Sequence, residues 1–145
     1  MNAEDREAAT AVLRRACVGR QICGIHFYAF PILILDSGGN NADKSIGDNE
    51  LFLRIESGWT FIDSGRPTEE ANHPERPLEE LAAVAARLRS FPIRSVQLGA
   101  TADLTLEFEG GAALVLAGYD PQYESWELSG DGTMVVALPG GEVTF

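Results

Sequence analysis

The segment Leu104-Thr105-Leu106-Glu107-Phe108-Glu109-Gly110-Gly111-Ala112-Ala113-Leu114-Val115-Leu116 decides the fold, because it describes one antiparallel hairpin. Apolar and polar residues alternate along its first arm, which is the period of a strand with one buried face. The Gly-Gly pair supplies the positive φ angles of a tight turn, and an apolar arm then returns. Leu104, Leu106 and Phe108 are therefore expected to face the core, and Glu107 and Glu109 the solvent.

The same kind of alternation, broken by turn residues, extends over most of the chain. Strands joined by short turns pair antiparallel, so mostly antiparallel sheet is expected. Two polar tracts, 37–49 and 64–76, are predicted to be long loops. The predicted strands are 22–28, 30–36, 51–56, 59–63, 93–99, 103–109, 112–117, 123–128, 133–138 and 142–145.

Two amphipathic stretches, 3–17 and 77–90, predict helices. Asn2 can cap the first helix and Gly19 can end it, whereas Pro77 suits the first position of the second. A helix with one apolar stripe must bury that stripe against another element. The predicted fold class is therefore α+β, with two helices packed on twisted, mostly antiparallel β-sheet.

The chain is expected to form a single domain, 1–145, that contains two similar halves. The order of one helix and four strands occurs in 3–63 and again in 77–145, which suggests a tandem α-β-β-β-β duplication. A rival alignment, which sets 51–62 against 104–115, leaves Trp126 without a counterpart. The preferred alignment matches Ile22–Phe27 with Ile93–Leu98, Ile32–Gly39 with Leu104–Gly111 to within one residue, Leu51–Leu53 with Leu114–Leu116, and Trp59 with Trp126.

Charge is distributed unevenly along the chain, whose formal net charge is −11. Residues 95–145 contain eight acidic side chains and no Lys, Arg or His. A folded surface of one sign attracts partners of the opposite sign, so a basic protein partner is expected. Nucleic acid and anionic membranes need clusters of Lys and Arg, and neither is expected as a partner.

Other features favour a cytoplasmic protein. The acidic start of the chain does not resemble a signal peptide, and the longest apolar stretch, Phe27–Leu35, is too short to span a bilayer. Cys17 and Cys23 are predicted to be buried thiols and not a disulfide framework.

No pattern in the sequence indicates a catalytic, metal or cofactor site. The two histidines, His26 and His73, lie in an apolar strand and in a polar loop, and neither belongs to a nucleophilic or zinc motif. We therefore expect a protein that is not an enzyme and that needs no cofactor. A hydrolase that uses a pair of carboxylates would show no recognisable motif in the sequence.

One segment, 119–127, interleaves aromatic and acidic residues. Large aromatics on strands are usually core, which is the main interpretation of Trp59 and Trp126, but aromatics are also enriched at binding hot spots. The segment precedes or begins a strand, so part of it is expected at a sheet edge. The candidate partner-binding residues are Tyr119, Asp120, Tyr123, Glu124, Trp126 and Glu127.

The second half of the chain resembles a family of small bacterial proteins known only as a domain of unknown function. The resemblance rests on Leu104–Gly111, on the Tyr-Glu-x-Trp-Glu-Leu pattern of 123–128, and on Pro139-Gly140-Gly141-Glu142 with the strand before it. It covers about the last 50 residues and implies no catalytic residues. Such proteins look like bacterial immunity proteins in size, charge and patterning.

The leading hypothesis is a non-catalytic, acidic protein-binding module, an immunity protein that neutralises a basic toxin. Two alternatives belong to other classes. The first is a self-associating structural module, a homodimer in which the segment Val143-Thr144-Phe145 pairs with a second copy. The second is a hydrolase whose carboxylate site the sequence does not reveal.

Overall fold

The computed structural model describes residues 1–36, 50–63, 66–67 and 78–145. Within these ranges the chain forms two helices and eleven strands. In chain order the elements are α1 (Ala3–Cys17), β1 (Gln21–Phe27), β2 (Pro31–Asp36), β3 (Leu51–Ile55), β4 (Trp59–Asp63), β5 (Arg66–Pro67), α2 (Leu78–Leu88), β6 (Ile93–Leu98), β7 (Leu104–Phe108), β8 (Ala113–Leu116), β9 (Trp126–Gly130), β10 (Thr133–Leu138) and β11 (Glu142–Thr144).

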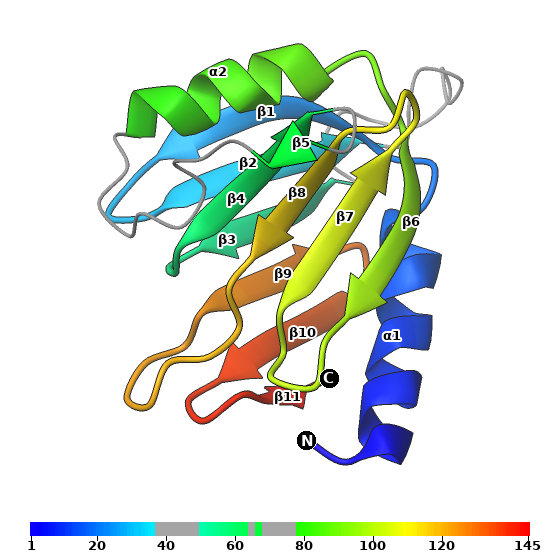
Figure 1. Cartoon of the computed structure of the whole chain (residues 1–145), viewed down its shortest axis with the longest axis vertical. Coiled ribbons are helices and arrows are strands. Elements are labelled where there is room, and N and C mark those ends of the chain that lie inside the picture. The colour runs from blue at the N-terminus through cyan, green and yellow to red at the C-terminus, as the bar shows by residue number, and fades with distance from the viewer. Residues whose placement is uncertain (37–49, 64–65, 68–77) are drawn as a thin grey trace.

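The strands form two antiparallel sheets that face each other (Figure 1). One sheet has the order β1-β2-β3-β9-β10-β11, and the other has the order β5-β4-β8-β7-β6. The predicted α+β class with antiparallel sheet is confirmed. The short strand β5 lies inside the tract predicted as a loop, 64–76, so that prediction was wrong at two residues. The tract 37–49 and the remainder of 64–76 lie outside the described residues.

Each helix spans the side of the molecule between the two sheets. Helix α1 packs against β6 of the smaller sheet and against β10 and β11 of the larger one. Helix α2 packs on β1, and its Arg87 guanidinium lies 5.2 Å from the centre of the Phe61 ring on β4 and pairs with Asp63. The helices therefore close the sides of the sandwich and bury the edges of its core.

Local signals explain the ends of α1. The side chain of Asn2 accepts a hydrogen bond of 2.7 Å from the backbone N–H of Asp5, as expected of a capping residue. Past the other end, Gly19 has φ +88°, and its N–H donates to the carbonyl of Ile93. Pro77, the predicted first residue of α2, lies outside the described residues.

The core lies between the sheets and is built from alternate residues of each strand. Leu104, Leu106 and Phe108 are completely buried, which is the face that the hairpin pattern predicts. Trp59 and Trp126 are also buried, and the indole Nε1 of Trp126 donates a hydrogen bond of 2.9 Å to the carbonyl of Ala102. Their main interpretation as core residues is confirmed.

Each half of the chain exchanges strands with the other. The three-strand meander β1-β2-β3 pairs with β9 from the second half, and the meander β6-β7-β8 pairs with β4 from the first. Trp126 stands opposite Ile55 in one of these pairs, and Trp59 stands opposite Leu116 in the other. Corresponding elements thus occupy corresponding places in the two sheets.

The strand registers also correspond, with one adjustment to the alignment. The β1–β2 pair is irregular between Ile22 and Gly24, and the β6–β7 pair is irregular between Ile93 and Ser95, the aligned positions. Leu33 pairs with Leu53 in the first half, and Leu106, which takes the place of Leu33 in the second half, pairs with Leu114. Leu53 therefore corresponds to Leu114 and not to Leu116. The alignment of 51–53 was therefore wrong by two residues. Duplication as the origin of this arrangement stays a prediction.

Candidate functional site

Four connections meet at one end of the sandwich and line an open pocket of about 570 Å³. They are the β1–β2, β3–β4 and β10–β11 turns and the β8–β9 loop, 117–125, all at the left of Figure 1. The loop supplies most of the lining. The pocket is lined by Phe30, Glu56, Asp120, Gln122, Tyr123, Glu124 and Pro139.

Hydrogen bonds hold the β8–β9 loop in its conformation. One carboxylate oxygen of Asp120 accepts from the N–H groups of Gln122 and Tyr123, each at 2.8 Å. The Asp120 carbonyl accepts from the N–H of Gly140 at 2.7 Å, which ties the loop to the β10–β11 turn. The N–H of Gly118 donates to a carboxylate oxygen of Asp103 at 2.8 Å. Asp120 therefore shapes the pocket as well as lining it.

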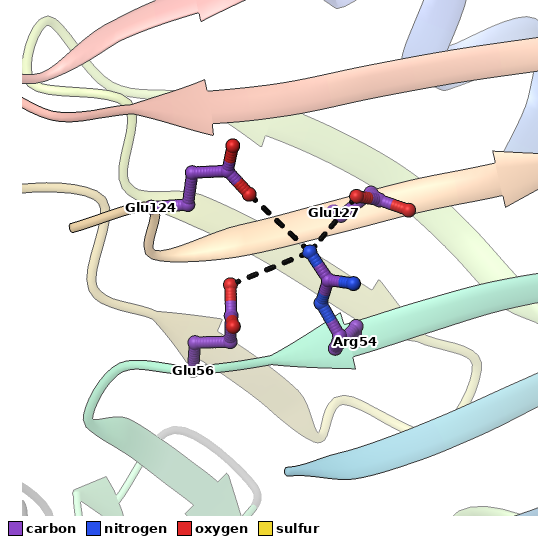
Figure 2. A network of polar contacts seen from close by, with 4 residues as sticks. All are labelled: Arg54, Glu56, Glu124 and Glu127. Carbon is purple, nitrogen blue, oxygen red and sulfur yellow. Dashed lines mark hydrogen bonds and ion pairs between the residues drawn. The ribbon is translucent and has the colours of Figure 1, made fainter. Parts of the chain in front are cut away.

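Three glutamates converge on Arg54 next to the pocket (Figure 2). The guanidinium nitrogen NH2 of Arg54 lies 2.9 Å from Glu127, 3.3 Å from Glu124 and 3.6 Å from Glu56. Arg54 and Glu127 are paired residues of β3 and β9, so the exchange of strands between the halves creates this cluster. One guanidinium cannot neutralise three carboxylates, and the cluster keeps an excess of negative charge.

Glu56 is the most enclosed carboxylate of this cluster, with a side chain that is 16% exposed. Burial raises the pKa of Glu56, because an ionised carboxylate loses its hydration there. Arg54 lowers this pKa, and Glu124 and Glu127 raise it again, so that the net shift is upward. Removing the negative charge of Glu124 or Glu127 would therefore lower the pKa of Glu56, and so would the arrival of a cation.

Five of the six predicted contact residues lie at or beside the pocket, and the sixth lies in the core. Asp120, Tyr123 and Glu124 line the pocket, Glu127 adjoins it through Arg54, and Tyr119 is exposed on the same loop. Trp126 is completely buried and hydrogen-bonded within the core. Its place among the partner-binding candidates is wrong, because a side chain with no exposed surface cannot contact a partner.

Sequence reasoning missed the aromatic turn between β1 and β2. Phe27, Tyr28 and Phe30 are 49%, 71% and 41% exposed, and Phe30 lines the pocket. The signal was present, since three aromatics within four residues precede Pro31. It was overlooked because this stretch was divided between two predicted strands, where aromatics are normally buried.

Cys17, Cys23 and His26 lie outside the pocket lining. Cys17 is buried, which raises the pKa of its thiol to about 12. Cys23 is exposed, so the prediction that both thiols are buried was wrong at this residue. It lies at the irregularity of β1, an edge strand. His26 is exposed on β1, and its ring meets the Tyr28 ring edge-on at 6.0 Å. His73 lies outside the described residues.

In the described ranges, 1–36, 50–63, 66–67 and 78–145, no group of three or more His, Cys, Asp or Glu side chains is placed to hold a metal ion. Neither of the helices in these ranges has the length and apolar character needed to cross a membrane.

Comparison with known proteins gives one match. A model of a family described as "Family of unknown function (DUF6188)" matches residues 40–145. No curated protein and no solved structure matches the chain. The matched residues include Arg54, its three glutamates and the whole β8–β9 loop, whereas the aromatic β1–β2 turn precedes them.

Proposed function

Because the chain belongs to that family of unknown function, we propose a function from its site: it is a non-catalytic protein that binds a basic protein partner at the acidic pocket. The observation that carries the proposal is the pocket itself. Glu56, Asp120 and Glu124 line it together with the rings of Phe30 and Tyr123.

Electrostatics support a basic partner. The net charge of −11 raises the encounter rate with a cationic protein, and the effect weakens as salt screens it. The excess negative charge beside Arg54 lies at the pocket, where a partner's cation would both pair with carboxylates and relieve the repulsion among them. An acidic partner would meet this repulsion instead.

The exposed aromatics support binding through contact and not through charge alone. Tyr123 is 70% exposed and Tyr119 is 58% exposed beside the carboxylates. Tyrosines bury a large area at little cost in side-chain entropy and are enriched at hot spots. A surface of acids and tyrosines therefore suits a protein partner better than a small free cation.

At a finer level we propose a cytoplasmic bacterial immunity protein whose partner is a basic toxin. The support is the acidity of the chain and the absence of a catalytic motif in its sequence. This proposal predicts a toxin gene directly upstream. A gene that stands alone would contradict the immunity role and leave the binding role intact.

The decisive experiment is co-expression with the product of the upstream gene. If that product stops growth alone, the wild-type chain is expected to restore growth, whereas the double variant E56Q/E124Q restores it poorly. E7Q/E109Q is the matched control, because it removes the same charge from two exposed positions outside the pocket. Equal protection by both double variants would refute the role of the pocket.

Two measurements separate the alternatives. Self-association through β11 predicts a dimer mass in light scattering, and a monomer at high concentration would exclude it. A hydrolase would use Glu56 as its acid, since burial raises the pKa of this group. That alternative predicts turnover of a glycoside or ester substrate that E56Q abolishes.

A further inference from the structure

The β1–β2 turn exposes more aromatic surface than a solvent-facing hairpin needs. Phe27 pairs with Pro31, so that residues 28–30 form the turn, and three of the four residues from Phe27 to Phe30 carry exposed rings. Of the nine large apolar side chains exposed in the described ranges, five lie on this turn and on the β8–β9 loop. Apolar side chains clustered in this way mark a contact surface.

The surroundings of the turn define the chemistry of its partner. Residues 27–31 carry no charge, but Phe30 reaches the pocket that Glu56 and Glu124 line. A wholly apolar partner would bury these carboxylates with only the shared Arg54 as counter-ion, which is costly. A partner that covers both the turn and the pocket therefore needs cations that also tolerate contact with aromatic rings.

Arginine meets both requirements better than lysine does. Its planar guanidinium stacks on aromatic faces and donates paired hydrogen bonds to a carboxylate, whereas the lysine ammonium is a compact and strongly hydrated charge. The chain already contains this arrangement once. Arg87 lies over the ring of Phe61 at 5.2 Å while it pairs with Asp63.

We propose that the aromatic β1–β2 turn is the second part of the docking surface and that it selects arginine over lysine in the basic partner. The inference rests on the proposed function, because it assumes that a basic protein occupies the acidic pocket. It adds Phe27, Tyr28 and Phe30 as contact residues and assigns them the choice between the two cations.

Binding of two peptides of equal charge, nona-arginine and nona-lysine, tests the proposal by calorimetry at physiological ionic strength. We expect the wild-type chain to bind nona-arginine roughly fivefold more tightly or better, since each exposed ring adds a modest cation–π term. F27A/Y28A is expected to reduce nona-arginine affinity to the nona-lysine level. F91A is the control, because Phe91 is an aromatic of similar exposure outside the turn and the pocket lining.

The outcomes distinguish this inference from the proposed function. Equal affinity for the two peptides, lost in E56Q/E124Q, would overturn arginine selection and support the acidic pocket. A preference for arginine that survives F27A/Y28A would also overturn it. No salt-sensitive binding of either peptide would contradict both proposals. Y28L, which keeps the apolar bulk and removes the ring, provides a second test should the double variant fold poorly.

Discussion

Three glutamates share Arg54, and two of them, Glu124 and Glu127, come from the other half of the chain. The Nε atom of Arg54 is buried without a hydrogen-bond partner in the described part of the structure, so the guanidinium is held mainly at its NH2 end. This side chain therefore joins β3 to β9 and limits the repulsion at the pocket.

Replacing Arg54 by Met should lower the free energy of unfolding by about 1–3 kcal/mol at neutral pH, because three carboxylates lose their counter-ion. Urea denaturation measures the loss. The loss should shrink as acid protonates the glutamates. Adding E127Q to R54M should restore part of the stability, and a double variant no more stable than R54M would contradict this account.

Glu56 gives a pH dependence of definite sign. Its folded pKa is raised, so the folded chain holds more protons than the unfolded chain between the two pKa values. Its contribution to stability is fully present below the unfolded pKa and is lost as the pH rises through the folded pKa. Relative to wild type, E56Q should therefore gain stability as the pH rises from the ordinary glutamate pKa through the raised folded pKa of Glu56, as measured by urea titrations. A stability difference between E56Q and wild type that does not change with pH would contradict this account.

Replacing Trp126 by Phe tests the buried hydrogen bond between its indole Nε1 and the carbonyl of Ala102. The variant W126F keeps an aromatic ring but leaves the carbonyl of Ala102 without its donor at 2.9 Å and leaves a gap in a completely buried site. A loss of about 2–4 kcal/mol in unfolding free energy is expected. Y123F is the control, because Tyr123 is 70% exposed and should change stability by less than about 0.5 kcal/mol.

At the scale of elements, the β8–β9 loop depends on one close approach. A Cβ atom at Gly118 would overlap the backbone of Ala102 and Asp103, and the same glycine donates its N–H to Asp103. G118A should therefore move the loop away from β7, lower stability by about 2–4 kcal/mol and weaken partner binding. G58A is the matched control, because a Cβ at Gly58 meets nothing within 4 Å. Equal stability of the two variants would contradict this contact.

The helices and strands were largely predictable from the sequence. One error shows why some of their boundaries were not. The strand predicted at 123–128 forms at Trp126–Gly130, because Asp120 binds the N–H groups of Gln122 and Tyr123 and holds them in a turn. Alternation along a segment reports which face is buried, but it does not report such side-chain caps. Boundaries set by caps therefore require the structure.

The site was predictable only in part, for a similar reason. The aromatic and acidic composition of 119–127 identified the loop, because its residues are neighbours in the sequence. Arg54, Glu56 and Phe30 joined it only through the pairing of β3 with β9 and through the meeting of four connections. Nothing in the local pattern indicates which distant strands pair, so Arg54 and Glu56 could not be assigned beforehand, and Phe30 could not be placed beside them.

At the scale of the whole molecule, each half of the chain is stabilised by strands and a helix of the other half. The β3–β9 and β4–β8 pairs cross between them, and each helix packs on a strand of the opposite half, α1 on β6 and α2 on β1. A chain cleaved at a protease site placed between Asp63 and Leu78 should therefore remain one particle in gel filtration and separate in urea. Two independently eluting fragments without denaturant would refute this interlocking.

The exchange of strands also determines when the protein can fold during synthesis. Strand β3 has no neighbour on one side until β9 leaves the ribosome, and β4 waits in the same way for β8. At ~5–20 residues per second, the interval from Ile55 to Gly130 lasts roughly 4–15 seconds. Over that time a nascent chain carries unpaired strand edges, which are sites of aggregation. Slower elongation would lengthen this exposure, and the yield of native protein should depend on translation speed and on chaperones.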